Sequence, residues 1–115
     1  MKRGEVYNAV LSPRSGSEQS GRRPVIVVSH DGFNSTPGWR SIIVVPVSTS
    51  AKQAARGPTA VPLAKGAGGL TADSVALCHQ VTTLDRAKLT HCTGALNAMD
   101  LARTEAGLKA AMDLR

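Results

Sequence analysis

Short apolar segments separated by turn residues run through most of this 115-residue chain and limit the folds open to it. Aliphatic and β-branched residues, chiefly Val, Ile, Leu and Thr, are concentrated in segments of strand length. Five such segments are predicted as β-strands: residues 5–11, 25–30, 41–48, 59–63 and 74–81. Gly, Pro and Asp separate them, as in the Pro-Gly pair at 37–38 and the Gly-Pro pair at 57–58. This pattern predicts a small sheet with tight connections.

The second and third of these strands, 25–30 and 41–48, are apolar at consecutive positions. Since neighbouring residues of a strand point to opposite faces, both faces should be buried and both strands should lie in the middle of the fold. Pro46 cannot donate a hydrogen bond to a neighbouring strand, so the third strand should bulge, end or lie at an edge there. Such an irregularity would redirect Ser48 and Thr49, which follow it.

The pattern changes after residue 84. A short helical turn is predicted at 85–88 and a last short strand at 93–96. Asn97 is a typical N-cap residue, and we expect a helix from there to about residue 113, with Gly107 as a weak position. The fold class predicted is therefore mainly β with a C-terminal helix, in one α+β domain over residues 1–115. Its sheet should be strongly bent or form an SH3-like barrel.

The net charge of +6 is unevenly distributed. Residues 1–56 carry eight Lys or Arg against three acids, whereas residues 57–115 carry six against five. A basic half of a small domain suits a polyanionic partner such as a nucleic acid, although an ordinary soluble surface explains the charge equally well. No apolar leader follows Lys2 and Arg3, and the cysteines Cys78 and Cys92 suggest free thiols, so a cytoplasmic protein without a membrane segment is expected.

The segment GSEQSGRRP at residues 16–24 leads directly into the apolar strand that starts at Val25. It combines a carboxylate, Glu18, with an amide, Gln19, and with the twin arginines Arg22 and Arg23. A guanidinium is planar and permanently charged, and at the end of a rigid strand it is well suited to hold a phosphate.

Several motifs together resemble the MazF/PemK family of toxin endoribonucleases. They are the opening MKRGEVY, the loop GSEQSGRRPVIVV, the strand IIVVPVST, the segment GGLTADSVALCHQVTTLD and the closing amphipathic helix. The match covers nearly the whole chain in the family's order. It implies a CcdB/PemK-like barrel, a homodimer, and cleavage of single-stranded RNA within a short preferred sequence. It also implies that no metal or other cofactor takes part, and that an acidic cognate antitoxin neutralises the protein.

The resemblance also implies catalytic positions. The family's arginine directly before the proline falls on Arg23, and its threonine after the third strand's V-P-x falls on Ser48, with Thr49 as a possible substitute. Arg23 would stabilise charge on the phosphoryl oxygens and Ser48 would donate a hydrogen bond to the same phosphate. Glu18 either acts as general base or holds Arg23 by pairing with it.

The remaining candidates would bind RNA. Arg14 and Arg22 should contact flanking phosphates, and the polar residues Ser17, Gln19, Thr49 and Gln80 should contact the substrate, the two glutamines at base edges. His79 replaces the acid that many family members carry before the glutamine, and of the three histidines it is the best candidate for protonating the leaving group.

Other residues leave alternatives open. Trp39 could stack on a base or cover a dimer contact. The glycine-rich run at 66–69 lacks a following Lys-Ser or Lys-Thr and is predicted to be a mobile loop, not a nucleotide cradle. The pairs Cys78-His79 and His91-Cys92 do not have the spacing of a zinc site.

Two other functions compete with the ribonuclease. One is a non-enzymatic toxin on the same barrel that binds a protein target such as a topoisomerase. The other is a basic nucleic-acid-binding module without catalysis.

Overall fold

The computed structural model describes residues 1–11, 21–50, 52 and 57–115. The strands are β1 (Glu5–Leu11), β2 (Gly21–Val27), β3 (Ser41–Ser48), β4 (Ala60–Leu63), β5 (Ser74–Leu77), β6 (Thr82–Asp85) and β7 (Leu89–Ala95). The α-helices are α1 (Asp31–Asn34) and α3 (Ala98–Met112), and the 3₁₀ turns are η1 (Gly57–Thr59), η2 (Ala67–Gly69), η3 (Cys78–Gln80) and η4 (Arg86–Lys88). Within these ranges no helix combines the length and apolarity needed to cross a membrane.

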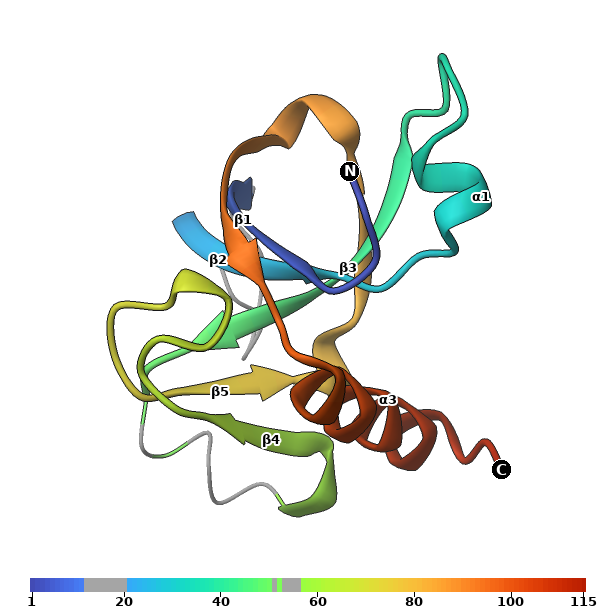
Figure 1. The fold of residues 1–115 in the computed structure, drawn as a ribbon. Coiled ribbons are helices and arrows are strands. Elements are labelled where there is room, and N and C mark those ends of the chain that lie inside the picture. Colours follow the sequence, from blue (N-terminus) through green and yellow to red (C-terminus); the bar gives the residue numbers. More distant parts are fainter. Residues whose placement is uncertain (12–20, 51, 53–56) are drawn as a thin grey trace.

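All the strand pairs are antiparallel, in the order β4-β5-β3-β2-β1-β7, with β6 also paired to β3. Figure 1 shows β3 running through the middle of the molecule, with α3 beside β4 and β5 and α1 at the opposite end of β3. The prediction of a mainly β fold with a C-terminal helix is confirmed. The end strands β4 and β7 do not pair with each other in the described ranges, so the strongly bent sheet is not a closed barrel.

As predicted for the central strands, both faces are buried at the end of β2 and over residues 44–48 of β3, whereas Ile43 is 42% exposed. Along β2, Val25 and Val27 pack into one apolar cluster while Ile26 packs into another on the opposite face. Along β3, Val44 belongs to the first cluster and Val45 to the second. This alternation fixes the register of the sheet, since a slip by one residue would exchange the two faces of each strand.

Pro46 marks the point at which β3 changes partner. The ladder with β2 ends at the pair Val25–Pro46, and β3 then pairs with β5 through Val47 and Ser48. The predicted irregularity therefore takes the form of an end to one ladder. Its physical reason is that Pro46 has no N–H to donate.

Several predicted boundaries differ from the observed ones. Strand β2 begins at Gly21, earlier than predicted, because Leu11 and Gly21 already pair across β1 and β2. It also ends earlier, since the chain turns into α1, where Nδ1 of His30 accepts from the amide of Gly32. The predicted strand at 74–81 stops at Leu77, and the strand β6 that follows η3 was not predicted. Strand β7 starts at residue 89 and not at 93.

The C-terminal helix agrees with its prediction at both ends. Oδ1 of Asn97 accepts from the amide of Asp100 at 2.8 Å, which makes Asn97 the N-cap. Gly107, expected only to weaken the helix, lies where α3 meets the sheet. A Cβ at this position would come within 2.7 Å of both Sγ of Cys78 and Cγ2 of Val61, so its absence allows the helix to approach.

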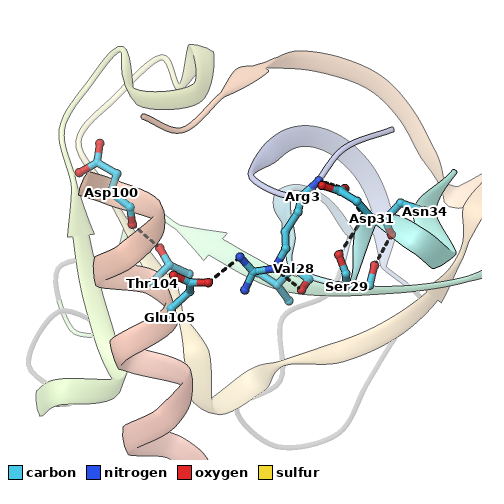
Figure 2. Close-up of polar contacts among 8 residues, drawn as sticks. All are labelled: Arg3, Val28, Ser29, Asp31, Asn34, Asp100, Thr104 and Glu105. Atoms are coloured by element: carbon cyan, nitrogen blue, oxygen red, sulfur yellow. Dashed lines mark hydrogen bonds and ion pairs between the residues drawn. The ribbon is translucent and has the colours of Figure 1, made fainter. Parts of the chain in front are cut away.

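A chain of polar contacts joins the N-terminus, α1 and α3 (Figure 2). Nε of Arg3 donates to the carbonyl of Val28 at 3.0 Å, and its Nη1 pairs with Glu105 at 2.5 Å. The amide of Asn34, a side chain only 1% exposed, donates to the carbonyl of Ser29 at 2.8 Å. Buried polar groups are thus satisfied where these elements meet.

Candidate functional site

Arg22 and Arg23 are the second and third residues of β2. The pairs Val10–Arg22 and Ala9–Arg23 hold their backbone against β1, and both side chains are exposed. Because side chains alternate along a strand, Arg23 shares the face of Val25, and Arg22 points to the opposite face. The twin arginines therefore project from a rigid strand end on both of its sides.

Other arginines of the described residues are used to hold the fold together. The bonds are from Arg3 to Glu105 and Val28, from Arg40 to Asp85, from Arg86 to the carbonyls of Asn34 and Trp39, and from Arg103 to Asp100. By contrast, neither Arg22 nor Arg23 has a hydrogen bond or ion pair from its guanidinium to any residue of the described ranges. Within the described ranges, no other residue occupies their guanidinium N–H donors.

Ser48 ends β3 and is 7% exposed. Its Oγ accepts from the amide of Ser50 at 3.1 Å, which orients the oxygen and leaves the hydroxyl proton to be donated elsewhere. If the register of the pair Val25–Pro46 were continued by two residues, Arg23 would face Ser48 across the ends of the two strands. Both also belong to the face of the sheet that carries Val44.

Thr49 and Pro24, each adjacent in sequence to one of these two residues, line a cavity of about 280 Å³. Its other walls come from β1, β5, β7 and the connection between β4 and β5. The cavity therefore lies at the same strand ends as the exposed guanidinium of Arg23 and the hydroxyl of Ser48, although its described lining includes only their sequence neighbours.

Four of the predicted site residues, Arg14, Ser17, Glu18 and Gln19, lie outside the described residues. The choice between Glu18 as base and Glu18 as partner of Arg23 stays a prediction.

His79 and Gln80 lie on η3 and not on the predicted strand. His79 is exposed, and its Nε2 lies 3.4 Å from Nε2 of Gln80. Since Ser48 pairs with Val75, His79 lies four residues farther along the chain, in the turn that packs on α3. His79 and Gln80 therefore lie away from the end of β3 that carries Ser48.

The close packing of the connection at 64–73 against β7 was not predicted from the sequence. Predicted as a mobile loop, the connection contains the turn η2, and Oγ1 of Thr93 donates to the carbonyl of Gly68 at 2.8 Å. Gly69 has φ +80°, and a Cβ there would lie 2.1 Å from the carbonyl oxygen of Thr93. Consecutive glycines beside a predicted strand were the available signal for such a close approach of backbone to backbone.

The described residues hold no cluster of metal ligands. Within the part of the chain that the structure describes, no three His, Cys, Asp or Glu residues are grouped so that they could hold a metal ion. Cys78 is buried beside α3 and Cys92 is exposed on β7, and both are free.

Comparison with known proteins identifies the family. Residues 2–112 match the sequence profile described as PemK-like, MazF-like toxin of type II toxin-antitoxin system. This chain belongs to that family. The resemblance predicted from the motifs is thereby confirmed.

Curated members of the PemK/MazF-like family are similar over most of the chain. Endoribonuclease MazF9 of Mycobacterium tuberculosis is 34% identical over 117 residues, covering 99% of this chain and 98% of its own. Endoribonuclease MazF of Staphylococcus saprophyticus is 40% identical over 89 residues, covering 77% of this chain and 72% of its own.

Solved structures of the family share the fold. MazF from Deinococcus radiodurans superposes with a TM-score of 0.79 at 26% identity, over 99% of this chain and 97% of that protein. A MazE–MazF complex from the same organism matches with a TM-score of 0.75 at 26% identity, over 100% of this chain and 97% of the matched chain.

Proposed function

We propose that this protein is the toxin of a toxin–antitoxin system and acts as a sequence-selective endoribonuclease on single-stranded RNA. In the proposed reaction no metal takes part. The substrate's 2′-hydroxyl attacks the adjacent phosphorus, and the products carry a 2′,3′-cyclic phosphate and a 5′-hydroxyl. The observation that carries this proposal is the exposed arginine Arg23 at the start of β2, which has no structural partner in the described ranges, on a strand that pairs with β3, the strand that ends at Ser48. The names of the curated relatives support the enzyme class.

Arg23 would hold the phosphoryl oxygens as negative charge accumulates on them. Its planar fork can donate two parallel hydrogen bonds to two oxygens, a geometry that the ammonium group of a lysine does not offer. Ser48 would donate its hydroxyl proton to the same phosphate, since its oxygen is already oriented by the amide of Ser50. Thr49, exposed next to it, would contact the substrate on the other side of the strand.

Proton transfer remains with two candidates, Glu18 and His79. Glu18, two positions after Gly16 in the sequence, would remove the 2′-proton or hold Arg23. His79 would protonate the leaving 5′-oxygen. Because η3 lies away from the strand end that carries Ser48, this role requires a substrate that extends along β3 toward α3 or a site completed by a second subunit.

The other proposed contacts bind the RNA on either side of the cleaved bond. Arg14 and Arg22 would contact phosphates, and Ser17, Gln19 and Gln80 would contact sugars or base edges. These contacts determine where the enzyme cuts and not how.

A cleavage assay in excess EDTA tests this function. The wild-type protein should cut a mixed transcript and leave 5′-hydroxyl ends, and an RNA with a 2′-deoxy sugar at the cleaved nucleotide should resist. Arg23→Ala should lower the rate by about 10²–10³-fold with an unchanged melting profile, as expected for loss of one preorganised donor. Equal cleavage of the deoxy substrate would contradict the mechanism.

The same variant separates the enzyme from its competitors. Toxicity that persists in Arg23→Ala cells would favour a non-enzymatic toxin that binds a protein target. RNA retardation on a gel without strand scission over hours would favour a binding module.

A homodimer is the proposed assembly, and an exposed apolar surface supports it. Phe33 is 50% exposed and stacks on Trp39, with ring centroids 4.7 Å apart, and Ile43 beside them is 42% exposed. A cavity of about 320 Å³ lies among Phe33, Trp39, Ile43 and Val28. Exposed patches of this kind usually mark interaction sites, and we therefore propose for Trp39 a role in the dimer contact in preference to base stacking.

The proposed inhibitor is a cognate antitoxin with an acidic segment. The net charge of +6, with most of the excess in residues 1–56, would attract such a segment, and the complex of the Deinococcus relatives is a precedent for the partner. Excess acidic peptide from the cognate antitoxin should abolish cleavage. An activity that is unaffected would rule this partner out.

The proposed location is the cytoplasm, where an RNA substrate is present and thiols stay reduced, as the free Cys78 and Cys92 require.

A further inference from the structure

The cavity of about 280 Å³ at the strand ends has walls that carry no charged side chain among the described residues. Its described lining consists of Asn8, Pro24, Thr49, Gly69, Leu70, Thr71, Ala72, Ser74 and Thr93. Five of these nine side chains are amides or hydroxyls, and the others are small or apolar. Hydrogen-bonding groups next to apolar surfaces, as in this described lining, suit a neutral heteroaromatic group.

The position of the cavity relates it to the twin arginines. Asn8 and Pro24 pair across β1 and β2, and by strand alternation they share the face to which Arg22 points. Arg23 and Ser48 belong to the other face of the same strand ends. A polynucleotide that crosses these ends would therefore meet the two guanidinium groups with its phosphates, and the cavity would be within reach of a neighbouring base.

The wall formed by residues 66–72 is built to keep its shape. The amide of Gly66 donates to the carbonyl of Leu70 at 2.8 Å, and Thr93 holds the carbonyl of Gly68 at the same distance. The amide of Lys65 donates to Oδ1 of Asp73 at 2.8 Å, which closes the base of the connection. A preformed wall lets a pocket discriminate among ligands, because little ordering is needed on binding.

We infer that this cavity is a subsite for one unpaired base next to the cleaved phosphate, and that Asn8 and Thr71 determine which base it accepts. The inference rests on the proposed ribonuclease function. The Asn8 amide offers a donor and an acceptor side by side, the pattern with which asparagine reads a base edge in nucleic-acid complexes. Leu70 and Pro24 supply apolar surface for the ring faces. Single-stranded RNA leaves base edges and faces free for such contacts.

Sequencing the 5′-hydroxyl ends from a mixed transcript tests this subsite, with wild type, Asn8→Ala, Thr71→Ala and the control Met99→Ala. Thr71 is exposed in the connection, so its truncation should not disturb folding, and Met99 is 73% exposed on α3 outside the cavity. Asn8→Ala and Thr71→Ala should reduce the preference for the favoured base about tenfold at one and the same position. Preferences at the other positions, and the Met99→Ala profile, should match wild type.

Two results would overturn the inference while leaving the proposed function intact. One is an unchanged preference in both cavity variants when they still cut RNA. The other is an equal loss of preference at every position, which would indicate general damage. If Asn8→Ala does not fold, as judged by its thermal melt, Thr71→Ala alone decides. A wild-type protein that cuts no RNA would instead contradict the proposed function, and the subsite with it.

Discussion

The backbone amide of Arg3 donates to Oδ1 of Asp31 at 2.6 Å and thereby joins the N-terminal segment to the first turn of α1 (Figure 2). The side chain of Asn34 donates to the same carboxylate oxygen at 3.1 Å. These bonds, the first above all, hold the pKa of Asp31 below its ordinary value. Since Arg3 also pairs with Glu105 of α3, one residue connects the two helices to the strand end at Val28.

Asp31→Asn should make folding stability less dependent on pH. Because the folded-state pKa of Asp31 lies below the unfolded value, its contribution is complete above pH ~4 and is lost as the pH falls through the folded pKa. We expect the variant to be less stable than wild type by about 1 kcal/mol at pH 6, and the difference to shrink toward pH 2. Urea unfolding across this range measures it. A constant difference would contradict the assigned role.

Gly107→Ala should destabilise the protein even though alanine is the better helix former. The substitution gains about 1 kcal/mol in helix propensity, but its methyl group would overlap with Cys78 and Val61, and overpacking typically costs about 1–3 kcal/mol. The matched control is Ala106→Gly on the exposed side of α3, which should lose about 1 kcal/mol through propensity alone. Thermal melts of both variants would test this, and a raised melting temperature for Gly107→Ala would show that the contact can relax.

Cys92 should react with a thiol reagent in the native protein and Cys78 should not. Cys92 is exposed, whereas Cys78 is fully buried and burial raises the pKa of its thiol to about 11, so it stays protonated at pH 8. One thiol per chain should be modified rapidly, and both in urea. Cys92→Ser should remove the rapid phase. Rapid modification in that variant would mean that α3 opens readily from the sheet.

Arg22→Ala should weaken RNA binding in a salt-dependent way. If Arg22 contacts one phosphate, its removal should reduce the slope of log K against log salt by about 0.7, the value for one phosphate on a single strand. Arg115→Ala removes the same charge at the C-terminus and should leave the slope nearly unchanged. Titrations of a non-cleavable deoxy-substituted RNA at several salt concentrations would measure both. Equal effects of the two variants would indicate a general charge effect.

Phe33→Ser should weaken the proposed homodimer. Phe33 and Trp39 form the stacked centre of the exposed apolar surface, and loss of a central aromatic residue usually costs at least about tenfold in affinity. Met99→Ser, which removes a 73% exposed side chain on α3, is the control and should leave self-association unchanged. Sedimentation equilibrium would distinguish them. Equal dissociation constants for Phe33→Ser and wild type would place any dimer contact elsewhere.

Features that depend on neighbouring residues were predicted well from the sequence. The limits of β1 and β3 agree with prediction, and Asn97 begins α3, because strand alternation and N-capping involve residues a few positions apart. The burial of both faces of β2 follows from the same local pattern. The motif around Arg23 was sufficient to indicate the family.

Features that depend on distant residues were not predicted. Strand β6 exists because Ser41–Val44 pairs with it, and η3 interrupts the predicted fifth strand where β3 passes from β6 to β5. The consequence for the site is that His79 leaves the strand on which it was expected. His79 is four residues from Val75 in the sequence, but its place in the fold could not be predicted without knowing which strands pair with β3.

The sequence by itself determined the family, the mainly β class, the C-terminal helix and the arginines at the start of β2, since each is encoded in a short, contiguous pattern. Only the tertiary structure decided that Gly107 is a packing position, that the glycines at 68 and 69 lie against β7, and that Asn8 and Thr71 share a cavity. The physical reason is that close packing and cavities arise between segments far apart along the chain, whose approach no local pattern specifies.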